Sequence, residues 1–112
     1  MARRILLHED FLADARRHED WLVRSGDEDW LVNLLSGIEE VAALLRRYPA
    51  IGPVLAENER LVLRSFPLRR YPYVIWFVYR RGARIGDVWL VRLFGARQDR
   101  PRADPESWRL PS

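Results

Sequence analysis

The sequence lacks residue types that supply much of the common chemistry of small proteins. It contains no cysteine, which excludes disulfides, thiolate nucleophiles and zinc sites built on sulfur. Its two histidines, His8 and His18, fit none of the usual metal-ligand spacings. We therefore expect neither a metal nor a cofactor, and a chain without cysteine is compatible with a reducing cytoplasm, where we expect the protein to act.

Several sequence patterns are missing as well. No apolar run approaches the roughly 20 residues that a membrane-spanning helix needs, and no signal-peptide pattern opens the chain. Glycine-rich phosphate loops and the G-x-S-x-G elbow of serine hydrolases are absent too. These absences exclude a membrane partner, nucleotide-binding folds of the common types and a hydrolase triad.

Lysine is missing, so arginine supplies all 19 basic side chains. The charge is unevenly distributed along the chain. Residues 1–60 hold 8 arginines and 12 acidic residues, whereas residues 61–112 hold 11 arginines and 4 acidic residues. The second half therefore carries a positive field, which suits either a nucleic acid or an acidic protein as partner.

The first half of the chain predicts one short strand and two helices. Residues 3–7 are apolar between charges, and residues 8–26 then change to helical spacing that ends at Gly26. Ser25 and Glu28 match a capping box for a second helix, whose apolar face continues until Pro49 stops it. The very short connection predicts an antiparallel helical hairpin.

The second half predicts strands. Residues 47–59 contain proline and glycine and are expected to form a loop. Three segments rich in β-branched and aromatic residues follow at 61–66, 73–79 and 87–94, with connections that require antiparallel neighbours. We therefore predict one α+β domain over residues 1–112, of order β-α-α-β-β-β. The hairpin covers one face of the sheet and leaves the other open, and an irregular tail begins near residue 98, with Trp108 docking back.

Arginines on and around the sheet are the remaining candidates for function. In the turns they are expected to be solvated, or to contact a partner. Alternation along the last strand places Arg92 on one face with Val88, Leu90 and Phe94, so its guanidinium must be paired or line a groove. The candidate residues for binding a target or a partner are Arg64, Arg69, Arg70, Arg80, Arg81, Arg92 and Arg97.

Three segments together resemble the RelE/ParE superfamily of toxins from type II toxin–antitoxin modules, which includes ParE-like plasmid stabilisation proteins. Residues 13–55 resemble its helical hairpin, with PAIG at 49–52 as the turn that follows the long second helix. Residues 63–82 are similar to its central strand pair, in which Pro72 and Tyr73 open a strand. Residues 88–99, VWLVRLFGARQD, look like its closing strand and basic exit.

The resemblance implies two alternative activities. RelE-like members cut mRNA on the ribosome through an internal 2′-hydroxyl, a reaction that needs a base, an acid and cations on the phosphoryl oxygens. ParE-like members bind DNA gyrase and carry out no chemistry. Both are neutralised by a cognate antitoxin whose tail covers the sheet and the helices. A third hypothesis is an interaction module that keeps the fold without toxicity.

Comparison with the family's motifs leaves the cleavage apparatus incomplete. Arg97 falls where the ribonucleases place an arginine after the last strand, and Arg64 lies on a strand that is basic in RelE-like members. Val74 and Gly95 occupy positions where many members have arginine and histidine. A ribonuclease would have to use Arg97 and Arg64 with acid–base groups drawn from Glu57, Glu59, Tyr71 and Tyr73. We therefore predict a toxin that binds gyrase, and we leave its status as an enzyme open.

Overall fold

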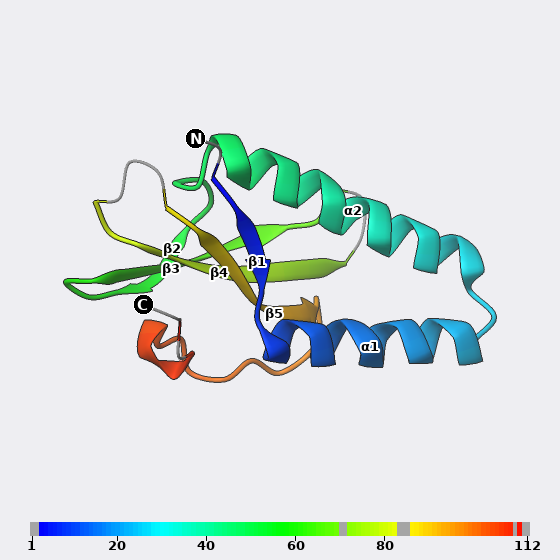
Figure 1. Ribbon diagram of the computed structural model, residues 1–112. Coiled ribbons are helices and arrows are strands. Elements are labelled where there is room, and N and C mark those ends of the chain that lie inside the picture. The colour runs from blue at the N-terminus through cyan, green and yellow to red at the C-terminus, as the bar shows by residue number, and fades with distance from the viewer. Residues whose placement is uncertain (1–2, 70–71, 83–85, 109, 111–112) are drawn as a thin grey trace.

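A computed structural model of the protein describes residues 3–69, 72–82, 86–108 and 110. Its elements follow the order β1 (Ile5–Leu7), α1 (Glu9–Arg24), α2 (Glu28–Arg47), β2 (Val54–Glu57), β3 (Leu61–Pro67), β4 (Tyr73–Arg80), β5 (Val88–Gly95) and the short 3-10 helix η1 (Pro105–Ser107). Figure 1 shows the two helices as a hairpin whose connecting turn points away from the sheet. The predicted α+β class is confirmed.

The five strands form one sheet in the order β1-β5-β4-β3-β2. β1 pairs in parallel with β5, with Ile5 opposite Val88, and every other pairing is antiparallel. The first and last strands of the chain therefore lie side by side. Arg4 strengthens this junction, because its Nη2 donates to the carboxylate of Asp87 at 2.8 Å.

The sheet has one more strand than the sequence predicts. The expected loop at 47–59 contains β2, four residues that pair with β3 at the sheet edge, with an irregular register between Val54 and Ala56. A four-residue, half-exposed edge strand is too short to show a clear alternation of apolar and polar residues. The preceding Gly52 and Pro53 are residue types typical of loops, so the segment resembles a loop in sequence. Pairing with β3 makes this segment a strand.

The predicted capping box at the start of α2 is wrong. The N-cap of α2 is Asp27, whose side chain makes no capping bond, and Ser25 instead belongs to the last turn of α1, where its N–H donates to the carbonyl of Trp21. Gly26 explains the difference, because its φ of 75° is the left-handed conformation that ends α1 after Ser25. The first helix is capped by His8, whose Nδ1 accepts from Asp10 N.

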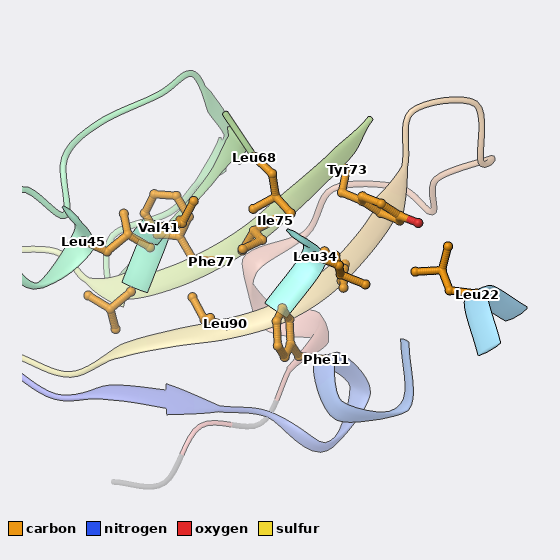
Figure 2. Close-up of a cluster of buried hydrophobic side chains, with 12 residues drawn as sticks. Phe11, Leu22, Leu34, Val41, Leu45, Leu68, Tyr73, Ile75, Phe77 and Leu90 are labelled. Carbon is orange, nitrogen blue, oxygen red and sulfur yellow. The ribbon is translucent and has the colours of Figure 1, made fainter. Parts of the chain in front are cut away.

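Two hydrophobic clusters lie on opposite faces of the sheet. The first joins the helices to the sheet, and Figure 2 shows Val41 and Leu45 of α2 beside Phe77 of β4. The second contains Trp76 and Phe94 with the buried Trp108 of the C-terminal segment. The second face is therefore covered in part by the chain's own tail, not left open as predicted, and the predicted docking of Trp108 is confirmed.

The last strand contains a bulge that changes the face of its later residues. Phe77 lies opposite Leu90 and Trp76 lies opposite Arg92, so Val91 is the extra residue. Leu90 therefore points to the helix-covered face, whereas Arg92 shares the other face with Phe94. The prediction that Arg92 lies on one face with Val88 and Leu90 is wrong, because simple alternation ignores the bulge.

Candidate functional site

The edge of β5 is closed by side chains of α1. β1 ends at Leu7, opposite Leu90, so no described strand flanks β5 on that side from Val91 onward. Asp14 Oδ2 accepts the backbone N–H of Leu93 at 2.9 Å, and His18 Nε2 lies 3.1 Å from the Leu93 carbonyl oxygen. Asp14 and His18 are one helical turn apart and therefore meet the same residue of β5. In this role His18 donates, so its proton lies on Nε2.

Arg92 is fixed by the same carboxylate. Its Nε lies 2.7 Å from Asp14 Oδ2 and its Nη2 lies 3.2 Å from Oδ1, while Arg17 also binds Oδ1. The Asp14 side chain is 1% exposed, and the Arg92 guanidinium stands 4.6 Å from the centre of the Phe94 ring. The sequence predicts that Arg92 is either paired or lines a groove, and the structure shows that it is paired. Its Nε and Nη2 bind Asp14 and anchor α1 to the sheet.

Two other predicted arginines are also bound within the chain. Arg64 donates from Nε to the Tyr79 hydroxyl at 2.8 Å and from Nη1 to the Gly52 carbonyl at 2.7 Å. Arg81 donates to the carboxylate of Glu57 and to a nearby backbone carbonyl. Arg64 therefore fastens the turn before β2 to the sheet, and Arg81 occupies the carboxylate of Glu57, one of the four acid–base candidates for a ribonuclease.

Three of the remaining predicted arginines, Arg69, Arg80 and Arg97, are exposed. Arg80 lines a polar pocket of about 680 Å³ together with Arg60 and Arg81. Arg69 and Arg97 make no hydrogen bond or ion pair with any residue that the structure describes. Arg70 lies outside the described residues, as does Tyr71.

The turn after β5 presents a row of cations, of which the sequence analysis named only Arg97. Gln98 fixes this turn, because its Oε1 accepts from Gly95 N at 3.1 Å. Arg97, Arg100 and Arg102 follow in exposed positions, and within the described chain none of them has a carboxylate partner. Arg100 rests near the Phe94 ring, with its guanidinium carbon 5.9 Å from the ring centre. The R-x-x-R-x-R spacing directly after a predicted strand was the available signal.

The residues proposed for RNA cleavage are spread along the sheet. Tyr73 lies opposite Gly95, at the same end of the sheet as Arg97. Arg64 lies opposite Phe77, four residues further along β4, which corresponds to about 13 Å along a strand. Glu57 lies beyond it, opposite Val62 at the other end of β3. The four groups do not converge on one point.

Tyr73 is also poorly suited to act as a base. Its side chain is buried, and its ring meets that of His18 edge-on at 5.0 Å. Burial raises the pKa of Tyr73 above its ordinary value near 10, so the phenol is neutral at physiological pH. The remaining alternative, Glu59, is exposed and lines the polar pocket at the opposite end of β4.

The described residues lack two further kinds of feature. They contain no group of three or more histidine, aspartate or glutamate side chains that could hold a metal ion. Among the described helices, none combines the length and the apolar character needed to cross a membrane. The exposed arginines after β5 are the candidate functional site.

Comparisons with known proteins give a match in structure only. No protein-family profile and no curated protein matches the sequence. Among solved structures, the chain is similar to one described as the "Chromosomal ParDE TA system from P. aeruginosa". The TM-score is 0.60 at 15% sequence identity, and the match covers 83% of this chain and 95% of the other. The predicted RelE/ParE-like fold is thereby confirmed.

Proposed function

We propose that the protein is the toxin of a type II toxin–antitoxin module and inhibits growth by binding a macromolecule, with DNA gyrase as the target. The shared fold with a chain of a ParDE toxin–antitoxin system supports the toxin assignment. In this proposal residues 1–112 act in the cytoplasm as one domain, and the segment from about residue 98 is its irregular tail.

The arrangement of the candidate residues favours binding over cleavage. A ribonuclease needs a base, an acid and cations around one phosphate. Here Glu57 is held by Arg81, Arg64 is held by Tyr79 and Gly52, and Tyr73 is buried at the opposite end of the sheet from Glu57. Loss of acid–base help costs roughly 10²–10⁴ in rate, so this set supports a protein that binds and does not cut.

The proposed contact with the target is the row formed by Arg97, Arg100 and Arg102. Exposed arginines without intramolecular partners can pair with phosphates or carboxylates of a partner without first breaking a bond within the chain. The proposed antitoxin neutralises the protein by covering exposed surfaces, including Arg69 and this row, with an acidic or amphipathic tail.

A supercoiling assay with purified gyrase tests the proposal. Wild-type protein should inhibit supercoiling, and a variant with Arg97, Arg100 and Arg102 all changed to alanine should inhibit at least roughly tenfold less, because charge-assisted contacts contribute about 1.5–3 kcal/mol each. Arg16→Ala is the matched control, since Arg16 is exposed on α1 and has no partner among the described residues. Normal supercoiling at excess wild-type protein would refute gyrase as the target.

Two further measurements distinguish the alternatives. Cleavage of mRNA in a translating extract, abolished by Arg97→Ala, would establish the ribosome-dependent endoribonuclease instead. Unimpaired growth on induced expression, with folded protein present, would establish the non-toxic interaction module.

A further inference from the structure

An apolar groove runs between α2 and the end of β3. It measures about 560 Å³ and is lined by Glu40, Val41, Ala43, Leu44, Phe66, Pro67 and Arg69. Val41 forms part of the core and is 4% exposed, whereas Leu44 on the rim is 36% exposed. The groove therefore continues the hydrophobic core to the surface and offers an aliphatic side chain a site between helix and sheet.

The adjoining sheet edge does not accept a strand. β2 covers β3 only as far as Val54 opposite Arg64, and the Ser65 N–H donates to the Pro53 carbonyl just beyond it. The next residue of β3 whose nitrogen points to this edge is Pro67, which has no N–H to donate. An occupant of the groove must therefore bind through side chains, as a helix does.

The charged residues of α2 are arranged so that they could pair with those of a second, antiparallel α2. Glu40, Leu44 and Arg47 lie on one stripe of the helix because they are spaced by four and three residues. The stripe thus carries a carboxylate, an exposed leucine and a guanidinium in order. Neither Glu40 nor Arg47 bonds through its side chain to a described residue. If a second α2 lies antiparallel across this stripe, Glu40 of each chain faces Arg47 of the other. One carboxylate–guanidinium pair then forms at each end of the contact.

We propose that a second copy of this chain occupies the groove. The two α2 helices pack antiparallel about a twofold axis near Ala43, whose small side chain permits close approach. Leu44 of each chain enters the groove of the other, and Glu40 faces Arg47 of the partner subunit. Arg69 stands on the groove rim as a second cation. The dimer is weak, because one helix and one groove bury less surface than stable interfaces of about 1,200–2,000 Å².

This inference goes beyond the proposed function and does not rest on it, since self-association is a property of the purified chain alone. Sedimentation equilibrium should show a wild-type mass that rises from one chain towards two between about 10 μM and 1 mM. Leu44→Asp should weaken the association at least roughly tenfold. Leu35→Asp is the matched control, because Leu35 is 44% exposed on the opposite flank of α2 and should leave the dimer intact.

A charge exchange tests the pairing directly. Glu40→Arg and Arg47→Glu should each weaken self-association, because each places like charges opposite one another. An equimolar mixture of the two variants should form a heterodimer, because the introduced arginine of one chain then faces the introduced glutamate of the other, and the native pair remains at the second contact. Circular dichroism confirms that each variant is folded.

Two results would overturn the proposal. One is a wild-type chain that remains monomeric up to 1 mM. The other is a mixture of folded Glu40→Arg and Arg47→Glu chains that associates no better than either alone. Either result would show that a second copy of this chain does not occupy the groove.

Discussion

The carboxylate of Asp14 accepts the backbone N–H of Leu93 at 2.9 Å, across 79 residues of sequence. The same carboxylate accepts two bonds from Arg92, so one buried side chain joins α1 to the last strand by three hydrogen bonds, while Arg17 of α1 also binds it. A helix thereby provides the hydrogen-bond partner that a neighbouring strand provides elsewhere in the sheet. Several measurable consequences follow from contacts of this kind.

Asp14→Ala should destabilise the fold by roughly 3 kcal/mol, because it leaves the Leu93 N–H buried without an acceptor and removes the counter-ion of Arg92. Urea unfolding followed by circular dichroism measures the change. Asp20→Ala, on the exposed side of α1, should change the free energy of unfolding by less than about 0.5 kcal/mol. Equal changes in the free energy of unfolding for the two substitutions would show that the contact of Asp14 with β5 does not stabilise the fold.

Two glycines with nearly the same backbone angle should respond differently to alanine. Gly52 and Gly26 have φ values of 77° and 75°, but a Cβ at Gly52 would overlap the Ser65 carbonyl, whereas one at Gly26 would meet nothing. Gly26→Ala should therefore cost about 1 kcal/mol from the left-handed conformation alone. Gly52→Ala should cost at least about 2 kcal/mol more, since backbone has to move. Thermal unfolding of both variants makes the comparison, and similar losses would contradict it.

The buried Tyr73 should make the protein sensitive to alkali. Burial raises the pKa of Tyr73 in the folded state above its ordinary value near 10, so the unfolded chain releases this proton first. The contribution of Tyr73 to the free energy of unfolding is therefore fully present below pH 10. It is lost as the pH rises from there through the folded-state pKa. The urea midpoint of Tyr73→Phe should fall less between pH 9 and 11 than that of the wild type. Tyr48→Phe, at a side chain that is 58% exposed, should retain the wild-type pH dependence.

Trp108→Ala should destabilise the protein by about 3–5 kcal/mol, because Trp108 is 4% exposed and packs edge-on against Trp76 at 6.3 Å between ring centres. Chemical denaturation gives the value. Trp21→Ala is the control, since Trp21 is 59% exposed and should cost under about 1 kcal/mol. A small loss for Trp108→Ala would mean that the tail leaves the sheet readily.

Arg64→Ala and Arg97→Ala should have different effects, because Arg64 has a structural role and Arg97 is proposed to contact the target. Arg64→Ala removes the bonds to the Tyr79 hydroxyl and the Gly52 carbonyl and should cost about 1–2 kcal/mol of stability. Arg97→Ala removes no described contact and should stay within about 0.5 kcal/mol of wild type. Under the proposed function, only Arg97→Ala should weaken growth arrest at equal levels of folded protein. Growth arrest that survives Arg97→Ala unchanged would contradict the assigned role.

Much of the fold could be predicted from local patterns. The apolar stripe of α2 and the β-branched runs of β3, β4 and β5 depend on short-range periodicity, which the sequence displays directly. The missed features depend on contacts between distant segments. β2 forms a strand because it pairs with β3. The face of the sheet on which Arg92 lies is set by the bulge that pairs Trp76 with Arg92.

The sequence predicts that the candidate site consists of arginines, but it does not predict which of them are bound within the chain. The sequence places arginines on the sheet but does not state which of them already have partners. Asp14, 78 residues before Arg92, occupies one guanidinium, and Tyr79 and Gly52 occupy that of Arg64. Arg97 remains available because the turn at Gln98 places it beyond the last strand.

The parallel pairing of β1 with β5 also determines when the molecule can be completed during synthesis. Ile5 is made well before its partner Val88, which follows only after both helices and three further strands. Pairing across such a sequence separation is slow to form, because a long loop must be closed before the contact is gained. The nascent chain therefore carries an unpaired first strand and an α1 without its anchor at Leu93 until the last strand appears. Under the proposed function, the surface at the end of β5 that contacts the target is assembled only after β5 has been made.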